Sequence, residues 1–281
     1  MARRDYLTDE DISALSPTEK MAIVSVADET GRPHQSLLSS LMASGPRELV
    51  IGEFTLGLSK DYMRERPKTG FVAMTLDRRM WRGAARWTRL ARQGSEYEAF
   101  NKKPMFRYNS YFGVNTVHYL DLAWIEGPAA LPIAGIAAAK VATMARGIEP
   151  ALRSYSGALS PYARSLIDAL ASLNFLSWID AEGEPRIVPV PQARSAGNGR
   201  IVFTPGPYGR DLVPIPEGAK ASIFSFNMSM ESLLALGTYR VSRKSGISRL
   251  GVLEIEEVYN PMPPIPGRVW PAPALEPVRE F

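Results

Sequence analysis

Residues 25–34 read SVADETGRPH and residues 177–186 read SWIDAEGEPR, and these two stretches decide the fold. Ser, Asp, Gly and Pro fall in register between them, with an offset of 152 residues. Each stretch is typical of a strand, a tight turn at Asp-x-x-Gly and a second strand that begins at x-Pro. Glycine supplies the positive φ angle that such a turn needs. The sequence therefore predicts the same β-hairpin twice in one chain.

Further matches follow in the same order along both halves. GFVAMTL (70–76) is similar in character to KASIFSF (220–226), and each precedes a strand with an internal glycine. ALSP occurs at 14–17 and 158–161, where Ser16 and Ser160 are good N-cap residues that predict two helix starts. This order predicts a mainly β fold with helices (α+β) in which one unit occurs twice. We expect domains at 1–130 and 161–281, joined by a connector at 131–160 that is helical at 134–146.

The composition excludes several classes of function. The 281 residues include no cysteine, so disulfides, thiolate catalysis and Cys-type metal sites are excluded, and with only His34 and His118 we expect no metal site. The net charge of +4 tolerates an anionic ligand without demanding nucleic acid. The N-terminal residues have no apolar signal-peptide core, and the most apolar tract, 131–145, is too short to span a bilayer. We therefore expect a cytoplasmic protein that makes no membrane contact.

Residues 54–70, FTLGLSKDYMRERPKTG, raise a question of chemistry. A phosphate dianion needs several donors and at least one fixed charge, which Thr55, Ser59 and Lys60 would supply at the exit of a strand. Lys60 also opens a short expected helix, whose free N–H groups favour an anion. The alternative is that Lys60 is an ordinary solvated residue at the start of a helix. The order of the surrounding elements favours the phosphate-binding interpretation.

The first half resembles the FMN-binding split β-barrel family typified by pyridoxamine 5′-phosphate oxidase. The resemblance rests on DETGRPHQSLLS (28–39), LVIGEFTLGLSK (49–60) and the strand FVAMTL (71–76). It covers residues 20–130 well and 175–260 faintly. It implies two tandem split β-barrels that form a pseudo-dimer within one chain, and a flavin bound in the crevice between them. The second barrel is degenerate, because TPGPYGRDLVPIPEG (204–218) stands where a Ser-Lys element should be. One FMN per chain is therefore expected.

The resemblance also implies which residues meet the cofactor. The oxidase has an Arg and a Lys on the x-Pro strand, whereas this chain has Ser36 and Leu41 at the matching positions. The strand can still offer its backbone to the flavin ring. The family pattern further places a polar contact near Arg78 or Arg82, and an Arg and a Trp near the C-terminus. The expected cofactor-binding residues are thus Gln35, Ser36, Leu37, Leu38, Thr55, Ser59, Lys60, Arg78, Arg82, Arg268 and Trp270.

Several alternatives stay open at this point. The family implies an FMN-dependent oxidoreductase acting on a small molecule, but no general base, nucleophile or metal set can be named, so the catalytic residues are unknown. A second reading is a non-catalytic split barrel that binds flavin, deazaflavin or haem. A third is a nucleic-acid or protein-binding module built on the Arg- and Trp-rich residues 77–92. His34 and His118 favour structural roles over ligand contact. Split barrels usually pair, so a homodimer of whole chains also stays open.

Overall fold

A computed structural model of the chain describes residues 2–16, 19–55, 57–102, 113–147, 154–242, 249–261 and 266–274. The chain divides into two compact units. The first comprises Met1–Pro132 together with Ser177–Val188, and the second comprises Ile133–Leu176 together with Pro189–Phe281. The hairpin at 177–186, which belongs to the second half of the sequence, is therefore part of the first unit.

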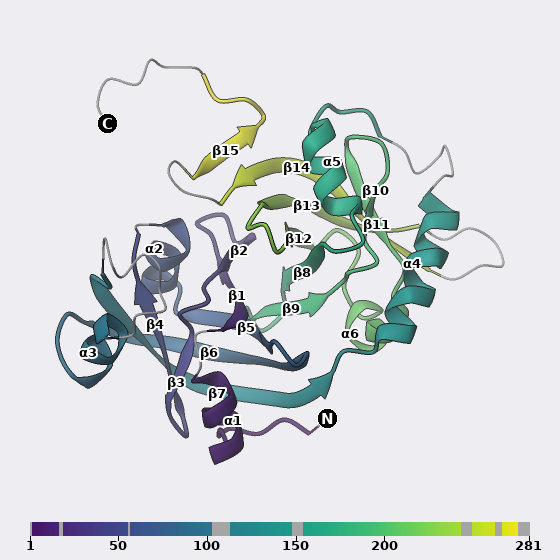
Figure 1. Ribbon diagram of the computed structural model, residues 1–281. Helices are drawn as coiled ribbons and strands as arrows, with labels where there is room; N and C mark the ends of the chain where they lie inside the picture. Colours follow the sequence, from purple (N-terminus) through teal and green to yellow (C-terminus); the bar gives the residue numbers. More distant parts are fainter. Residues whose placement is uncertain are drawn as a thin grey trace. The chain divides into compact units, whose positions relative to one another are not determined.

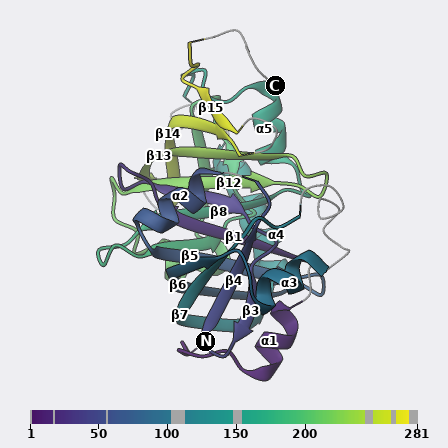
Figure 2. The ribbon, with the colours of Figure 1, turned by 90° about the vertical axis from the view of Figure 1, so that its left-hand side faces the viewer.

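The first sheet has seven strands in the order β2-β1-β5-β6-β7-β4-β3, and all six neighbouring pairs are antiparallel. Most of these strands can be followed in Figure 2. Helix α1 precedes β1, α2 connects β4 to β5, and α3 connects β6 to β7 (Figure 1). The elements are α1 (Asp9–Leu15), β1 (Lys20–Ala27), β2 (Pro33–Leu37), β3 (Met42–Gly45), β4 (Glu48–Glu53), α2 (Leu58–Glu65), β5 (Lys68–Thr75), β6 (Arg79–Ala91), α3 (Ser95–Lys102) and β7 (Thr116–Ala130).

The second sheet has eight strands, in the order β10-β11-β14-β13-β12-β8-β9 with β15 added on β14. The pairs that β14 makes with β11, β13 and β15 are antiparallel. The predicted mainly β fold with helices is thus confirmed. The elements are α4 (Ile133–Gly147), α5 (Pro161–Asp168), β8 (Leu173–Ile179), β9 (Pro185–Pro189), β10 (Arg194–Ser195), β11 (Arg200–Phe203), the 3₁₀ helix η2 (Gly206–Tyr208), α6 (Gly209–Leu212), β12 (Lys220–Phe226), β13 (Ser232–Ser242), β14 (Leu250–Asn260) and β15 (Gly267–Trp270).

Both hairpins have the same turn. Oδ1 of Asp28 accepts hydrogen bonds from the backbone N–H groups of Thr30 and Arg32, at 2.8 Å each. Oδ1 of Asp180 accepts from the N–H groups two and four residues further on, at 3.1 and 2.8 Å. An aspartate that binds its own downstream backbone in this way replaces the hydrogen bonds that a tight turn leaves unmade. This is the physical reason why Asp and Gly recur at these positions in both halves.

The repeat extends beyond the turn. Ser40 donates a hydrogen bond through Oγ to the carbonyl oxygen of Gly52, at 2.8 Å. Gln192 donates through Nε2 to the carbonyl oxygen of Thr204, at 2.7 Å. Each donor lies 12 residues before its acceptor. Gln192 and Thr204 also follow Ser40 and Gly52 by the same offset that relates the two turns. Different side chains therefore make the same tertiary connection in both halves.

Strand β1 is buried on both faces. Ala22, Val24 and Val26 point into the hydrophobic core of the first unit, which also contains Trp81. Ser25 lies on the opposite face and is also 0% exposed, because its hydroxyl contacts that of Ser177 at 2.8 Å. A strand without a solvent-facing side has no reason to alternate apolar and polar residues. This explains the nearly continuous apolar run of residues 21–27.

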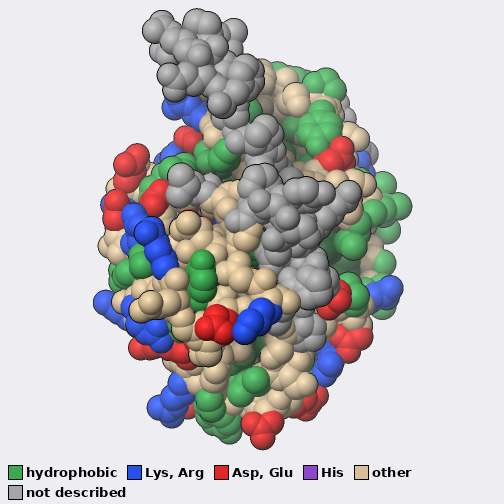
Figure 3. Space-filling view, turned by 60° about the vertical axis from the view of Figure 1, so that its left-hand side comes forward, with side chains coloured by type: hydrophobic (Ala, Val, Ile, Leu, Met, Phe, Trp, Pro, Cys, Tyr) green, Lys and Arg blue, Asp and Glu red, His purple; other side chains and the backbone are tan. Residues whose placement is uncertain are grey.

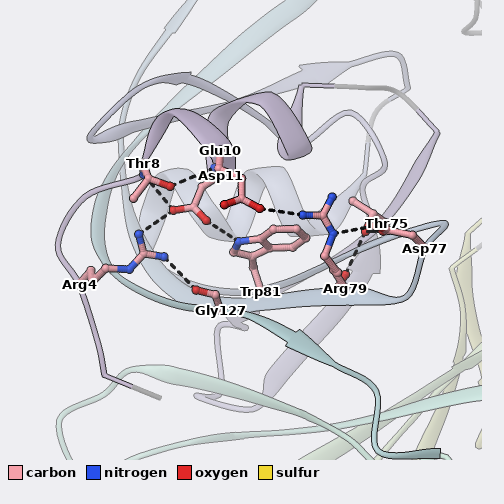
Figure 4. Close-up of polar contacts among 9 residues, drawn as sticks. All are labelled: Arg4, Thr8, Glu10, Asp11, Thr75, Asp77, Arg79, Trp81 and Gly127. Atoms are coloured by element: carbon pink, nitrogen blue, oxygen red, sulfur yellow. Dashed lines mark hydrogen bonds and ion pairs between the residues drawn. The ribbon is translucent and has the colours of Figure 1, made fainter.

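Helix α1 is anchored through Asp11, whose side chain is 1% exposed (Figure 4). Its Oδ1 accepts a hydrogen bond from Nε1 of the buried Trp81 at 2.8 Å, and its Oδ2 accepts from Nη1 of Arg4 at 2.7 Å. Thr8 is the N-cap, and its hydroxyl accepts from the N–H of Asp11 at 3.2 Å. Burial alone would raise the pKa of Asp11, but these hydrogen bonds hold it below the ordinary value.

One of the two predicted helix starts is wrong. Ser16 does not begin a helix: it ends α1, and its hydroxyl donates to the carbonyl oxygen of Ile12 at 2.6 Å. Strand β1 then begins at Lys20, and Pro17 and Thr18 lie outside the described residues. Ser160, in contrast, is the N-cap of α5 as predicted, with its Oγ accepting from the N–H of Ala163 at 3.2 Å. A Ser-Pro pair can end one helix or begin another, and only the neighbouring packing decides which.

Candidate functional site

The predicted phosphate-binding residues lie where β4 ends and α2 begins. Helix α2 starts at Leu58, two residues earlier than expected, so Lys60 is its third residue. Its N-cap, Gly57, has no side chain to satisfy the first backbone N–H groups. Ser59 and Lys60 are buried, with 3% and 6% of their surface exposed, whereas Thr55 is exposed. The alternative that Lys60 is a solvated helix residue is therefore wrong.

The Lys60 ammonium is held by two oxygens of the chain. Its Nζ donates a short hydrogen bond to the carbonyl oxygen of Thr55 and lies 3.4 Å from Oε1 of Glu53. Burial lowers the pKa of Lys60 because it disfavours the charged form, and the Glu53 carboxylate opposes this shift. A buried ammonium with one long carboxylate contact can accept a further anionic partner more readily than one in a tight ion pair.

Glu53 is oriented from its other side by His118. Its Oε2 lies 3.1 Å from Nε2 of His118, and Nε1 of Trp87 donates to Nδ1 of His118 at 3.2 Å. Because an indole N–H can only donate, Nδ1 of His118 is an acceptor and the proton of the neutral ring sits on Nε2. His118 therefore donates to Glu53. Burial would raise the pKa of Glu53, but the hydrogen bond from His118 and the charge of Lys60 lower it. We call Lys60, Glu53, His118 and Trp87 the Lys60 cluster.

The x-Pro strand, β2, lies beside the same helix. The imidazole ring of His34 on β2 and the ring of Tyr62 on α2 meet edge to face, with centroids 5.5 Å apart. Gln35 is buried and lies opposite Ser25 in the pairing of β2 with β1, and the residues from Ser36 to Leu38 are half-buried. Leu41, at the other position where the oxidase has a basic residue, is 2% exposed and part of the hydrophobic core. The structure thus brings β2 and α2 into one region of the first unit.

Arg78 and Arg82 are not part of this region. Arg78 is exposed in the turn before β6 and has a positive φ of 65°. Arg82 forms an ion pair with Glu126 on the neighbouring strand β7. Trp87 of the Lys60 cluster lies five residues beyond Arg82 along β6, or about 17 Å at about 3.3 Å per residue. Their predicted contact with a flavin ring stays a prediction.

Arg268 and Trp270 lie in the second compact unit on β15, where they are opposite Tyr259 and Val258 of β14. Arg268 is exposed and Trp270 is half-buried. Their contact with the cofactor stays a prediction.

The second half has a closed counterpart of the first-half site. Leu212, which occupies the position of the repeat equivalent to Lys60, is 1% exposed in α6. Helix α4 packs on this region: Oγ1 of Thr143 lies 3.0 Å from Oγ1 of Thr204. Gly206 approaches α4 so closely that a Cβ on it would lie 2.7 Å from Cβ of Ala139. Nearby, Tyr208 is buried and Arg210 is exposed. In the second half, the apolar side chain of Leu212 therefore stands at the position of the Lys60 ammonium, and helix α4 packs on this region.

The Arg- and Trp-rich residues 77–92 combine exposed arginines, among them Arg86 and Arg92, with buried and paired side chains. Trp81 is completely buried in the core and cannot stack on a base. On the face of the molecule in Figure 3, acidic and basic side chains are interspersed. Three of the arginines are paired with carboxylates: Arg79 with Asp77 and Glu10, Arg82 with Glu126, and Arg89 with Glu48. These contacts argue against a nucleic-acid interface on this strand.

Sequence reasoning missed Glu53 and Trp87 and favoured a structural role for His118 over ligand contact. A signal for Glu53 was present, because an acidic residue directly follows the apolar run LVIG (49–52) and directly precedes Phe54-Thr55. His118 and Trp87 could not be joined to it, because the three residues lie on β4, β7 and β6 and meet only through strand pairing. Among the described residues, no group of three or more His, Cys, Asp and Glu side chains is placed to hold a metal ion.

Comparisons with known proteins give similarities for parts of this chain. No protein-family model matches it, and no curated protein matches it at the significance threshold. Among solved structures, an FMN-binding protein from Syntrophomonas wolfei is 14% identical, with a TM-score of 0.37 over 43% of this chain and 86% of that one. A "putative pyridoxamine 5′-phosphate oxidase" from Lactobacillus delbrueckii is 17% identical, with a TM-score of 0.35 over 44% and 96%. An F420 reductase is 12% identical, with a TM-score of 0.34 over 43% and 98%.

These similarities each cover less than half of this chain, at identities of 17% or less. In the described ranges, no helix has both the length and the apolar character that a membrane span requires.

Proposed function

We propose that the chain is an FMN-binding flavoprotein that acts as an oxidoreductase on a small molecule. The flavin would supply the redox chemistry, and the chain would bind and orient it. The first half would hold the phosphate through the hydroxyls of Thr55 and Ser59 and the ammonium of Lys60. The backbone from Gln35 to Leu38 would lie along the ring.

One observation carries the proposal. Two buried polar residues, Ser59 and Lys60, are neighbours in the first turn of α2. The N-cap Gly57 offers that turn no side-chain hydrogen bond, although its carbonyl oxygen accepts from the N–H of Lys60 at 3.1 Å. Desolvation of a buried charge is costly, and the 3.4 Å contact with Glu53 leaves the Lys60 ammonium able to take a closer anionic partner. An arriving phosphate would receive hydrogen bonds from the N–H groups, the hydroxyl and the ammonium at once.

Histidine-ligated haem fits this chain less well than flavin. Both ring nitrogens of His118 are engaged by Trp87 and Glu53, and His34 is 5% exposed. Neither ring offers an open nitrogen at a surface where haem iron could approach. A deazaflavin that carries a phosphate would use the same donors as FMN, so it stays an alternative ligand for the same residues.

The test is reconstitution of the purified chain with FMN, riboflavin and haem in separate titrations. Quenching of flavin fluorescence reports flavin binding, and the Soret band reports haem. We expect saturable binding of FMN that is at least tenfold tighter than binding of riboflavin, because riboflavin lacks the phosphate. Equal affinities for the two flavins would show that Lys60 does not bind the phosphate. No flavin binding at all would overturn the proposed function.

A further inference from the structure

The Glu53 carboxylate is the ion-pair partner of the Lys60 ammonium that an anionic ligand would meet. Its Oε1 is 3.4 Å from the Lys60 ammonium and its side chain is 15% exposed. A phosphate that replaces this contact would meet a carboxylate within a few ångströms, and like charges at such a separation repel strongly in a partly buried site. The ammonium that would bind a phosphate therefore already has one anionic partner.

We propose that Glu53 is an internal competitor for the phosphate, so that the Lys60 ammonium exchanges its carboxylate partner for the ligand when the ligand binds. The identity of the ligand as FMN rests on the proposed function. The competition itself rests only on the contacts of Glu53 and would apply to any phosphate that enters at Lys60.

The contacts on the other side of Glu53 make such an exchange feasible. His118 donates to Oε2 of Glu53 and is itself fixed by Trp87, at 3.1 and 3.2 Å. When Lys60 turns toward a ligand, Glu53 keeps the hydrogen bond from His118 and is not left as an unpaired buried charge, which would be costly. The His118 imidazole thus keeps the Glu53 carboxylate hydrogen-bonded while the Lys60 ammonium binds the ligand.

The other carboxylate near Lys60 does not play this role. Asp61 follows it on α2, but its side chain is 54% exposed and forms an ion pair with Arg64 at 3.2 Å. Solvent and salt screen an exposed charge of this kind. Glu53 is therefore the carboxylate that decides how readily an anion reaches Lys60.

The experiment compares wild-type protein, Glu53→Gln and a matched control, Glu48→Gln. Glutamine is isosteric and can still accept the His118 hydrogen bond, so the fold should persist. Glu48 lies at the other end of β4, where it contacts Arg89 at 3.3 Å, and its substitution changes the net charge by the same amount. FMN and riboflavin affinities are measured by fluorescence quenching at one pH and salt concentration. Inorganic phosphate is tested by the shift it causes in the thermal unfolding midpoint.

We expect Glu53→Gln to bind FMN about tenfold or more tightly than wild type. A tenfold change corresponds to about 1.4 kcal/mol, and the repulsion between two charges at this separation exceeds that value at an effective dielectric of about 20. Riboflavin affinity should not change, and Glu48→Gln should behave as wild type. Phosphate should raise the unfolding midpoint of Glu53→Gln more than that of wild type.

Two results separate this inference from the proposed function. Glu53→Gln with unchanged or weaker binding of both FMN and phosphate overturns the inference, even if wild type binds FMN. A gain for phosphate without FMN binding by any variant supports the competition and contradicts the proposed function.

Discussion

The hydroxyls of Ser25 and Ser177 lie 2.8 Å apart, and these two residues occupy the same position in the two halves of the sequence. Both side chains are 0% exposed. A contact between equivalent positions is characteristic of an isologous contact. It fixes the hairpin at 177–188 within the first compact unit, next to β1. The sequence match that first suggested a repeat therefore also marks a point of contact.

Replacing one of these serines should lower the free energy of unfolding by more than half of the loss caused by replacing both. Ser25→Ala or Ser177→Ala leaves the other buried hydroxyl without this partner, which should lower the free energy of unfolding by about 1–3 kcal/mol. In the double variant no hydroxyl is left unpaired, so the loss should be smaller than the sum of the two single losses. Urea unfolding of the four proteins measures the coupling. Ser229→Ala, at an exposed turn, is the control. Strict additivity would mean that the hydrogen bond contributes nothing.

Lys60→Ala should weaken FMN binding about ten- to a hundredfold, because it removes a charge-assisted contact worth roughly 1.5–3 kcal/mol. Fluorescence titration measures the affinity, with circular dichroism to check the fold. Lys68→Ala is a matched control, since Lys68 is a half-exposed lysine of the same unit whose ion pair is with Glu184 at 3.2 Å. If the two variants bind FMN equally well, the phosphate lies elsewhere.

One chain should bind one flavin. The first half has Ser59 and Lys60 at the start of α2, whereas the second half has the buried Leu212 at the equivalent position and helix α4 packed nearby through Thr143. An apolar side chain cannot replace the ammonium that a phosphate needs. Flavin released from saturated protein by denaturation, divided by protein concentration, should give a ratio near one. A ratio near two would reveal a second phosphate site.

Stability should fall between pH 6.5 and pH 4 because of His34. Burial, opposed in part by the nearby Asp28 charge, lowers the pKa of His34 from 6.5 to about 4. The folded protein therefore binds fewer protons than the unfolded chain in this window, and its free energy of unfolding decreases as the pH falls. At about 1.4 kcal/mol per pKa unit the loss approaches about 3 kcal/mol.

His34→Phe should remove this part of the pH dependence while retaining a ring against Tyr62. Urea unfolding at several pH values measures the effect. Below about pH 4, both proteins should lose further stability, because Asp11, Asp28 and Glu53 have lowered pKa values in the folded state. Identical curves for the two proteins between pH 6.5 and 4 would show that His34 is not buried as a neutral ring.

Asp11→Ala should be among the most destabilising single substitutions in the first unit. It leaves the buried Nε1 of Trp81 without its acceptor and removes the salt bridge from Arg4 (Figure 4). We expect a loss of about 3 kcal/mol or more in the free energy of unfolding. Asp9→Ala, an exposed acidic residue in the same helical turn, should cost only a few tenths of a kcal/mol and serves as control. Similar losses for both would assign the effect to helix propensity.

The hairpins, the glycine inside β6 and the connector helix were predictable because each depends on local chemistry. Asp-x-x-Gly specifies a turn through its own backbone hydrogen bonds, and Gly83 is required where a Cβ would lie 2.4 Å from Cζ of Phe71. The periodic small and apolar residues of 131–145 indicated the helix that is α4. The Ser16 prediction failed because Ser-Pro fits both ends of a helix, and the packing of Asp11 on Trp81 places the helix before it.

The sequence by itself determined the mainly β class, the repeat of the Asp-x-x-Gly hairpin and the placement of Ser59 and Lys60 after a strand. These features follow from turn chemistry and periodicity, which act over a few residues. Only the tertiary structure decided that Lys60 is buried, that Glu53 contacts it and that His118 contacts Glu53. Those residues come from α2, β4 and β7, and the pairing of β4 with β7 sets His118 beside the end of β4, since Ile51 is opposite His118. A buried charge is defined by what surrounds it, and strand pairing between distant segments supplies those surroundings.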